Sequence, residues 1–280
     1  MILALALAAV AAAQDNAPGK PLLYQPVARE TQAAGPEFDE HDALRARLIK
    51  QGDWYSVPSA AQPVLLIVQK DYLDAAALKR FVSDVVEAVA GVPEYTGRKP
   101  PKYRGRIVFY VYDSGPMSEA DVPGVRKDER GVMMRFVKED EAPVFHELAH
   151  LLAGYSDSQS LAEGFAEEVE SHFRPGKAHA FTPADADPDA LAKASVARYP
   201  KPYFEAIGAP GYSNWSGEEI RHEYYFASWS FARWLIRCKD MKAFLRVLDG
   251  GGKDDAYASA YGEGLAALRA DWRAYLESRP

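Results

Sequence analysis

The apolar stretch Val64-Leu65-Leu66-Ile67-Val68 is the clearest strand signal in the chain, and the elements after it determine the fold class. A continuous run rich in β-branched residues is typical of a strand buried on both faces. Apolar residues at helical spacing follow from Leu78 to Val89, and this pattern ends at Gly91-Val92-Pro93. Residues 106–112 predict a second strand, and residues 131–137 alternate like a half-exposed third strand.

After residue 140 the strand pattern disappears and helical patterns replace it. We expect helices near residues 142–154, 159–172, 218–237, 241–248 and 264–277. A stretch rich in Pro, Ala and Asp, residues 174–217, predicts a long loop between the second and third of them. A small mixed sheet followed by a helical half is an α+β plan.

The chain before the first strand divides into two parts. Residues 1–13, MILALALAAVAAA, are uncharged and end in small residues, which is typical of a signal peptide cleaved after Ala13, although a basic n-region is missing. The run is too short to span a bilayer, so we expect a secreted or periplasmic protein without stable membrane insertion after cleavage. An uncleaved anchor or a buried helix is the alternative. Residues 14–62 predict a partly disordered N-terminal arm with one helix at 40–51, and residues 63–280 predict one domain.

The composition excludes several classes of protein. With 33 basic and 40 acidic residues among 280, the net charge is −7, which argues against nucleic acid as a partner. Apolar residues make up 48% of the chain, enough for a full core. A single cysteine, Cys238, excludes an intrachain disulfide and a cysteine-based zinc ribbon. Together with Trp229 and Phe231 at helical spacing, Cys238 is expected in the core.

The segment Pro143 to Leu152 carries the strongest functional signal. Its apolar residues form one helical stripe, with Pro143 near the first turn. His146 and His150 are four residues apart, so on a helix their imidazoles can converge on one ion. Glu147 completes the H-E-x-x-H pattern, in which two imidazoles bind Zn²⁺ and the carboxylate acts as general base. We therefore predict one Zn²⁺ per chain.

A catalytic zinc ion needs a third protein ligand and an open position for water. Glu163, on the next predicted helix, is the candidate, and Glu167 shares its face. Zinc-bound imidazoles usually pass their second N–H to a carboxylate, so Glu167 is predicted to support the ligands from outside. The alternative is that both glutamates belong to a charged helix face.

These residues resemble the glutamate-zincins, the class of the thermolysin-like and aminopeptidase N-like metallopeptidases. The similarity rests on His146-Glu147-x-x-His150 followed by Ala162-Glu163-Gly164-Phe165-Ala166, and it is closest to small peptidase-MA-like proteins over residues 63–280. The resemblance implies a zincin-like fold, peptide or protein substrates, and a tyrosine that stabilises the oxyanion. Tyr225 best fits that position, with Tyr224 and His222 as neighbours. Only twelve residues separate His150 from Glu163, so the substrate pockets of the larger enzymes do not carry over.

Three functional hypotheses follow. The first is a zinc-dependent peptidase in which Glu147 activates water. The second is a secreted zinc-binding protein without turnover. The third is a di-iron carboxylate protein, because Glu147-x-x-His150 and Glu219-x-x-His222 are both E-x-x-H motifs.

Overall fold

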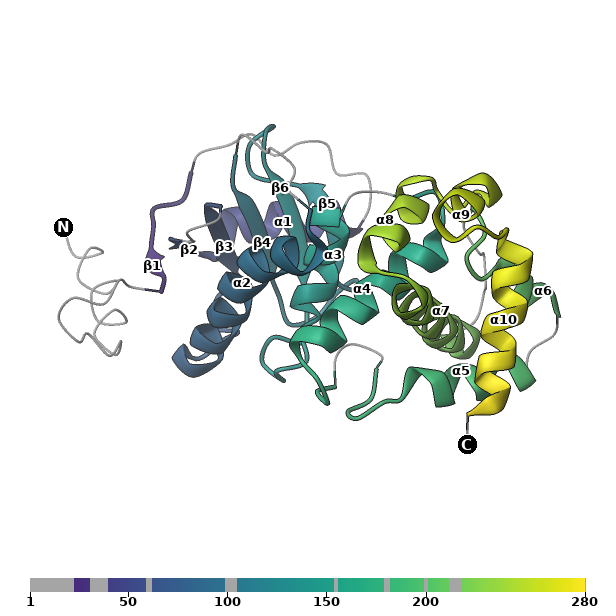
Figure 1. Ribbon diagram of the computed structural model, residues 1–280. Helices are drawn as coiled ribbons and strands as arrows, with labels where there is room; N and C mark the ends of the chain where they lie inside the picture. The colour runs from purple at the N-terminus through teal and green to yellow at the C-terminus, as the bar shows by residue number, and fades with distance from the viewer. Residues whose placement is uncertain are drawn as a thin grey trace, which may run out of the picture. The chain divides into compact units, whose positions relative to one another are not determined.

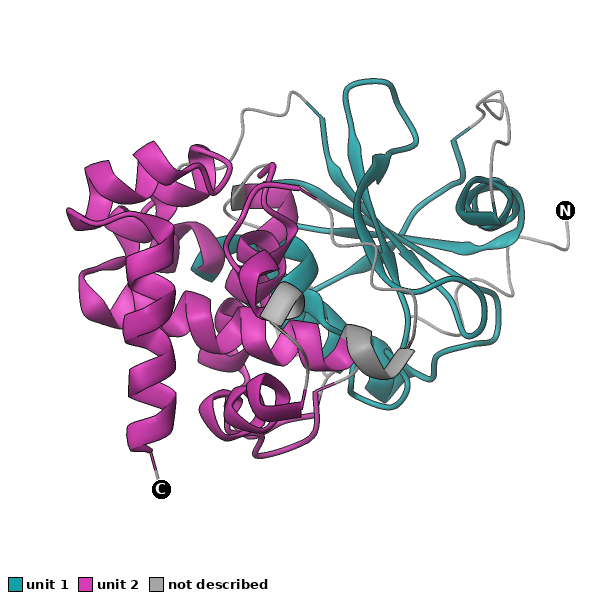
Figure 2. Ribbon diagram, turned by 90° about the vertical axis from the view of Figure 1, so that its right-hand side faces the viewer, with its two compact units in different colours: residues 1–91, 100–148 teal, residues 92–99, 149–280 magenta. Residues whose placement is uncertain are grey.

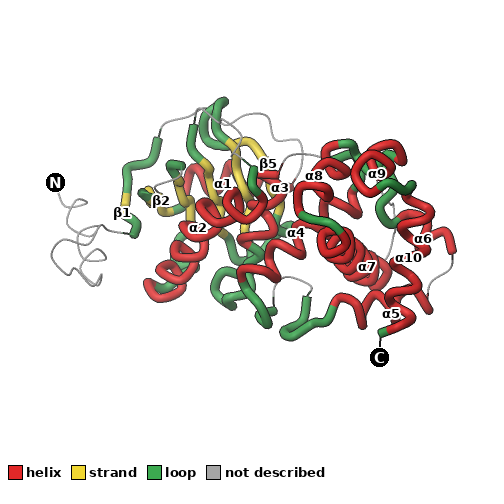
Figure 3. Tube along the Cα trace, in the orientation of Figure 1, coloured by secondary structure: helices red, strands yellow, loops and turns green. Residues whose placement is uncertain are grey.

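The computed structural model describes residues 23–30, 40–58, 62–98, 105–153, 156–178, 182–198, 201–211 and 218–279. In these residues every strand precedes residue 135, whereas helices continue to Ser278 (Figures 1 and 3). The predicted α+β class is confirmed, with a six-stranded mixed sheet in the N-terminal half and a mostly helical C-terminal half. The predicted signal peptide, residues 1–13, lies outside the described residues.

The sheet combines parallel and antiparallel pairs. Its strands are β1 (Gln25–Pro26), β2 (Asp53–Val57), β3 (Val64–Val68), β4 (Ile107–Val111), β5 (Glu119–Pro123) and β6 (Arg130–Met134). Their order across the sheet is β1-β2-β3-β4-β6-β5. The central strands β3, β4 and β6 run parallel, whereas β2 and β5 pair antiparallel with β3 and β6.

The chain divides into two compact units (Figure 2). Unit 1 comprises residues 1–91 and 100–148, and unit 2 comprises residues 92–99 and 149–280. Two of the boundaries fall inside helices, α2 (Ala75–Thr96) and α3 (Val144–Ala153). The extent of the predicted domain, 63–280, stays a prediction.

Side chains on the two faces of the sheet enter separate apolar cores of unit 1. On one face, Leu65 and Tyr110 belong to a buried cluster with Leu44 of α1 (Glu40–Gln51). On the other face, Phe109 meets Phe81 of α2 edge to face, with ring centroids 5.8 Å apart. Every residue of β3 and β4 is buried. The continuous apolar runs therefore reflect strands covered on both sides.

Three strands were not predicted from the sequence. The strands expected at 64–68, 106–112 and 131–137 are present as β3, β4 and β6, but β1, β2 and β5 carry no strong pattern. In β2 only Trp54 and Val57 are buried, and in β5 only Val122 is buried. These strands form because they pair with β3 and β6, so their stability depends on residues distant in the sequence.

Arg29, in the predicted arm, is joined by hydrogen bonds to a later part of unit 1. The Arg29 guanidinium donates to the carbonyl oxygens of Lys50, Gln51 and Gly52 at 2.7, 3.0 and 3.0 Å, at the end of α1. These are backbone groups that a helix end leaves without intrahelical donors. Glu30 pairs with Arg106 at 2.9 Å, so this segment also forms an ion pair next to the start of β4.

Helix α2 continues through Pro93, where the sequence pattern predicts an end. Pro93 lies in the last turn, so the missing N–H removes one hydrogen bond near a terminus and the helix is not broken. The Thr96 hydroxyl donates to the Val92 carbonyl at 2.8 Å. Gly97 follows in the left-handed region at φ 66°, which ends the helix one turn later than predicted.

Unit 2 consists of helices around α7. They are α4 (Gln159–Phe173), α5 (Pro188–Arg198), α6 (Lys201–Ala206), α7 (Glu218–Cys238), α8 (Met241–Asp249), α9 (Asp254–Tyr261) and α10 (Leu265–Ser278). Helix α7 packs against α4, α5 and α8 (Figure 1). Trp229 and Phe231 are buried as predicted, but Cys238 is exposed, because it is the last residue of α7 and lies beyond the packed part of the helix.

The loop predicted at 174–217 contains two helices, so that prediction is wrong. Helix α5 has no clear apolar stripe, and what holds it is the packing of Ala192, Ser195 and Asp189 within unit 2. A local signal exists at its start, because the Asp187 carboxylate accepts a hydrogen bond from the Asp189 N–H at 3.0 Å and Pro188 occupies the first turn. Helix α9 was also not predicted.

Gly208 lies in contact with residues of α4, α7 and α9, and the space around it is tightly packed. Its N–H donates to Ser160 Oγ at 2.7 Å, and its carbonyl accepts from the Tyr257 hydroxyl at 2.8 Å. It has φ 78°, and a Cβ there would lie 2.6 Å from atoms of Phe231 and Tyr257. Gly262 has a similar φ of 86°, but nothing lies within 4 Å of its Cβ position.

We therefore expect Gly262→Ala to lower the free energy of unfolding by about 1–2 kcal/mol through left-handed strain alone. Gly208→Ala carries the same strain and adds about 1–3 kcal/mol of overpacking. Urea unfolding followed by circular dichroism measures both. Equal losses for the two variants would contradict the packing described here.

Candidate metal centre

Helix α3 forms where the sequence predicts it. Glu147 N–H donates to the Pro143 carbonyl at 3.0 Å, so Pro143 begins the first turn without a missing bond. The predicted apolar stripe is buried, and it comprises Val144, Phe145, Leu148, Leu151 and Leu152. The polar side of the helix is covered too, because His146 and Glu147 are 8% and 6% exposed. Buried polar side chains on such a helix require polar partners or a ligand.

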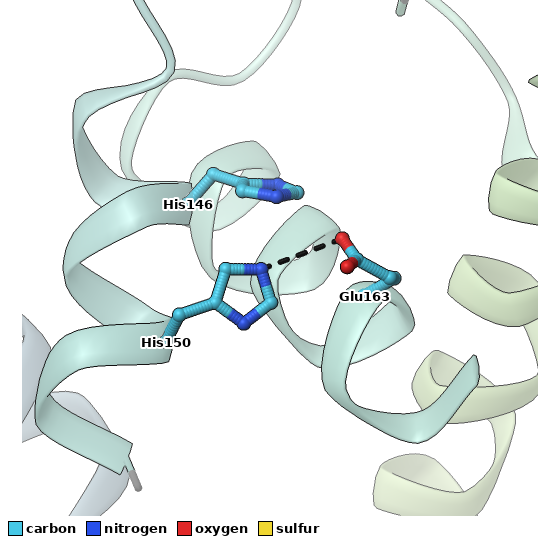
Figure 4. A group of neighbouring side chains, drawn as sticks. All are labelled: His146, His150 and Glu163. Carbon is cyan, nitrogen blue, oxygen red and sulfur yellow. Dashed lines mark ion pairs between the residues drawn. The ribbon is translucent and has the colours of Figure 1, made fainter. Parts of the chain in front are cut away.

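His146 and His150 project from the same side of α3, one turn apart (Figure 4). Their relative position follows from the helix itself, since residues four apart are neighbours on its surface. The His150 side chain is 24% exposed, so this end of the pair retains access to solvent.

Glu163 of α4 completes the group, as predicted. Its Oε2 atom lies 3.4 Å from Nε2 of His150 (Figure 4). His146, His150 and Glu163 each offer one ligand atom, and these atoms all lie within 4.8 Å of one another. In the described part of the chain this is the one group of three or more such residues close enough to hold a metal ion.

The donor set fits a zinc ion. Two imidazole nitrogens and one carboxylate oxygen form a ligand set known from catalytic zinc sites, with the fourth position left for water. Ligand atoms bound tetrahedrally at about 2.0–2.1 Å lie about 3.3 Å from one another. The 3.4 Å separation between His150 and Glu163 already matches that spacing.

Helix α4 carries a buried polar stripe that begins at Glu163. Glu167, Glu170 and Arg174 follow at helical spacing, and they are 5%, 0% and 6% exposed. Glu170 and Arg174 form an ion pair at 3.9 Å. When all four groups are ionised, one guanidinium against three carboxylates leaves the stripe with a net charge of −2. A divalent cation at the Glu163 end would balance that charge, and burial makes the balance important.

Glu167 lies one turn after Glu163, as the sequence spacing requires. Its Oε2 atom accepts a hydrogen bond from the Thr182 hydroxyl at 2.9 Å, and both residues are buried. The sequence pattern did not identify Thr182, because it lies in the segment predicted to be loop. The support of zinc ligands by Glu167 stays a prediction.

Glu147 of α3 is buried, and in the sequence it lies between His146 and His150. Its carboxylate acts on Tyr112 at the end of β4: burial raises the pKa of that phenol well above its ordinary value, and Glu147 raises it further, whereas Arg135 opposes the shift. The position leaves the proposed general base in a desolvated environment, where its charge acts strongly. Its role in proton transfer stays a prediction.

Tyr225, Tyr224 and His222 all lie on α7. Tyr224 is buried, whereas Tyr225 and His222 are half-buried. Three residues after Tyr225, the Ser228 carbonyl oxygen lies only 2.1 Å from the position that a Cβ on Gly164 would occupy. The backbones of α4 and α7 therefore meet directly at the residue after Glu163. This contact places α7 beside the α4 turn that carries the carboxylate ligand.

A second contact between α4 and α7 involves Glu168. Its Oε2 atom accepts a hydrogen bond from Trp229 Nε1 at 2.9 Å and lies 3.3 Å from Arg233 Nε. Burial raises the pKa of Glu168 above its ordinary value, and Arg233 and Trp229 oppose the shift. Both Gly164 and Glu168 thus contribute to helix packing, a role that the motif alone did not reveal.

The other described histidines have different neighbours. His172 stacks on Tyr95 with ring centroids 3.9 Å apart, and His41 pairs with Glu119 at 3.2 Å. His179 and the side chain of Glu219 lie outside the described residues, and so therefore does part of the second E-x-x-H motif of the di-iron hypothesis.

Protein-family models, curated proteins and solved structures were each compared with the chain, and none matches. The resemblance to glutamate-zincins therefore rests on the motif and on the geometry of the three ligands. Among the described residues, no helix combines the length and the apolar character that a membrane crossing needs.

The contact at Gly164 predicts that a larger residue at this position lowers the free energy of unfolding. Gly164→Ala gains about 1 kcal/mol of helix propensity, but the new Cβ meets backbone atoms that cannot rotate away. We expect the overlap to dominate and the free energy of unfolding to fall by about 1–3 kcal/mol in urea titrations. Ser171→Ala, at a half-exposed position of α4, is the matched control and should be neutral or slightly stabilising. A stabilised Gly164→Ala protein would contradict the helix contact.

The raised pKa of Glu168 predicts a pH dependence of stability. Between the ordinary carboxyl pKa and the raised one, the folded state binds more protons than the unfolded state, so stability falls as pH rises. We expect the unfolding free energy of wild type minus that of Glu168→Gln to decrease from about pH 4 upward and then level off. Urea unfolding at a series of pH values measures this difference. A difference that grows with pH would show that the ion pair with Arg233 outweighs burial.

Proposed function

We propose that this chain is a zinc-dependent hydrolase that cleaves peptide bonds. The observation that carries the proposal is the convergence of His146, His150 and Glu163 from two neighbouring helices, with ligand atoms within 4.8 Å of one another. This donor set leaves a coordination position for water, which is the feature that separates catalytic from structural zinc sites.

Zinc held by these residues would supply a Lewis acid and lower the pKa of a bound water to about 7. Side chains of the protein transfer the proton and bind the oxyanion. Glu147 takes a proton from the attacking water and delivers it to the leaving amine. Tyr225 donates a hydrogen bond to the oxyanion that develops on the substrate carbonyl. The chemistry needs one basic carboxylate and one neutral donor.

The buried surroundings support this assignment over a charged surface face. Glu167 and Glu170 are almost wholly buried, and so is Glu147. On a solvent-exposed helix face such carboxylates would lie in water, which solvates their charges well. Their burial, on the two helices that carry the group of His146, His150 and Glu163, favours a cation site. The zinc-binding protein without turnover is the competing hypothesis for the same site.

The decisive experiment compares metal content and hydrolysis in matched variants. We expect wild type to bind one zinc ion per chain and His150→Ala to lose it, whereas His41→Ala retains it. Glu147→Gln is expected to keep zinc while hydrolysis of an unfolded protein or a peptide library falls by about 10²–10⁴-fold. Glu139→Gln, at an exposed carboxylate, is the control for that substitution.

Each outcome separates the hypotheses. Zinc bound without any hydrolysis by wild type would favour the non-catalytic binding protein. Two iron ions per chain in place of one zinc would favour the di-iron protein. Full hydrolysis by Glu147→Gln would remove Glu147 from the mechanism.

A further inference from the structure

The hydrogen bond between Thr182 and Glu167 joins a distant segment to the helix that carries the third ligand. Thr182 Oγ1 donates to Glu167 Oε2 at 2.9 Å, and each residue is 5% exposed. The two residues are fifteen apart in the sequence. This contact is therefore tertiary, and it is made inside unit 2, where Glu163 and His150 also lie.

The chain after α4 turns back so that Thr182 can reach the helix. Arg174 N–H donates to the Glu170 carbonyl at 2.8 Å, which closes the last turn of α4. Gly176 then takes φ 74°, and its carbonyl accepts a hydrogen bond from the Asp185 N–H at 3.3 Å. Thr182 lies between these two joined positions, so the closure returns it toward α4.

A hydroxyl donor has a large effect on a buried carboxylate. Hydrogen bonds to an ionised acceptor are shorter and stronger than neutral ones, and a buried carboxylate without donors is strongly disfavoured. The Thr182 hydroxyl therefore holds Glu167 Oε2 in place and with it the orientation of the carboxylate.

Glu167 lies close to the proposed ligand Glu163 on α4, so the orientation of its carboxylate bears on the ligands. Glu163 and Glu167 are one helical turn apart on the same face, a spacing of about 5–6 Å between Cβ atoms. Carboxylates just outside a metal site orient its ligands, and their loss typically lowers metal affinity about 10–100-fold. A group that holds such a carboxylate acts on the site through it.

We propose that Thr182 is a positioning residue for the metal centre: by holding the Glu167 carboxylate, it couples the segment after α4 to the affinity of the His146, His150 and Glu163 group for zinc. This inference rests on the proposed zinc site. The competing reading is that the Thr182 hydroxyl stabilises α4 alone, without any effect on metal binding.

The test measures zinc affinity by competition with a chromophoric chelator, together with the visible spectrum of the Co²⁺-substituted protein. Thr182→Val keeps the shape and removes the donor, and we expect it to weaken zinc binding about 10–100-fold and to change the Co²⁺ spectrum. Thr182→Ser keeps the hydroxyl and is expected to retain near wild-type values for both.

Ser230→Ala is the matched control. Ser230 Oγ donates to Asp189 Oδ1 at 2.8 Å and accepts from Trp272 Nε1 at 3.1 Å, and all three residues are buried. The substitution therefore removes the same kind of hydrogen bond, and a second one, elsewhere in unit 2. We expect Ser230→Ala to lower stability in urea while zinc affinity stays at the wild-type value. A comparable loss of zinc affinity in this control would show a general effect of destabilisation and overturn the proposal.

Glu167→Gln tests the same link from the other side and covers the case in which Thr182→Val does not fold. It retains an oxygen for the Thr182 hydroxyl but loses the charge, so we expect weaker zinc binding in the same range. Unchanged zinc affinity in Glu167→Gln, or in a folded Thr182→Val protein, would overturn the role of Thr182 while leaving the zinc site intact. Wild type that binds no zinc would overturn the proposed function as well, so the two failures are distinguishable.

Discussion

The direct approach of α4 to α7 at Gly164 is the constraint on which the candidate metal centre depends. No side chain separates the helices there, because a Cβ on Gly164 would overlap the Ser228 backbone. Glu163 is the preceding residue, so its carboxylate is presented at a place determined by this contact. The hydrogen bond from Trp229 to Glu168 holds the same pair of helices together. The position of Glu163 thus follows from direct helix packing, and a preorganised site requires that its side chains be held on rigid elements.

Electrostatics explains why the centre occurs on this face of α4. Glu167 and Glu170 are buried, whereas the Glu163 side chain is 16% exposed, and solvation of a carboxylate weakens with burial. Arg174 neutralises one end of the stripe, and the Thr182 hydroxyl stabilises the middle. Glu163 lies beside His150 of α3, and imidazoles are neutral ligands when they bind metal. This arrangement is consistent with the divalent cation that we propose for the site.

Local periodicity explains which parts of the fold were predictable. Strands β3 and β4 are buried on both faces, so their apolar runs are continuous, and α3 has a clear apolar stripe. The weak strands β2 and β5 exist through pairing, and α5 through packing on α7, which no local pattern records. Pro93 was misleading because a proline in the last turn of a helix removes little hydrogen bonding.

The sequence by itself determined the pairing of the two histidines: four-residue spacing on a helix brings His146 and His150 together, whatever surrounds them. Glu163 lies with the two histidines as predicted, because the helix that carries it is amphipathic and follows closely in the chain, whereas its role as third ligand stays a prediction. Only the tertiary structure decided the environment of these ligands. The helix contact at Gly164 and the hydrogen bond from Thr182 to Glu167 join residues that are far apart in sequence. Such contacts depend on how the chain folds back on itself, and a spacing pattern contains no information about that.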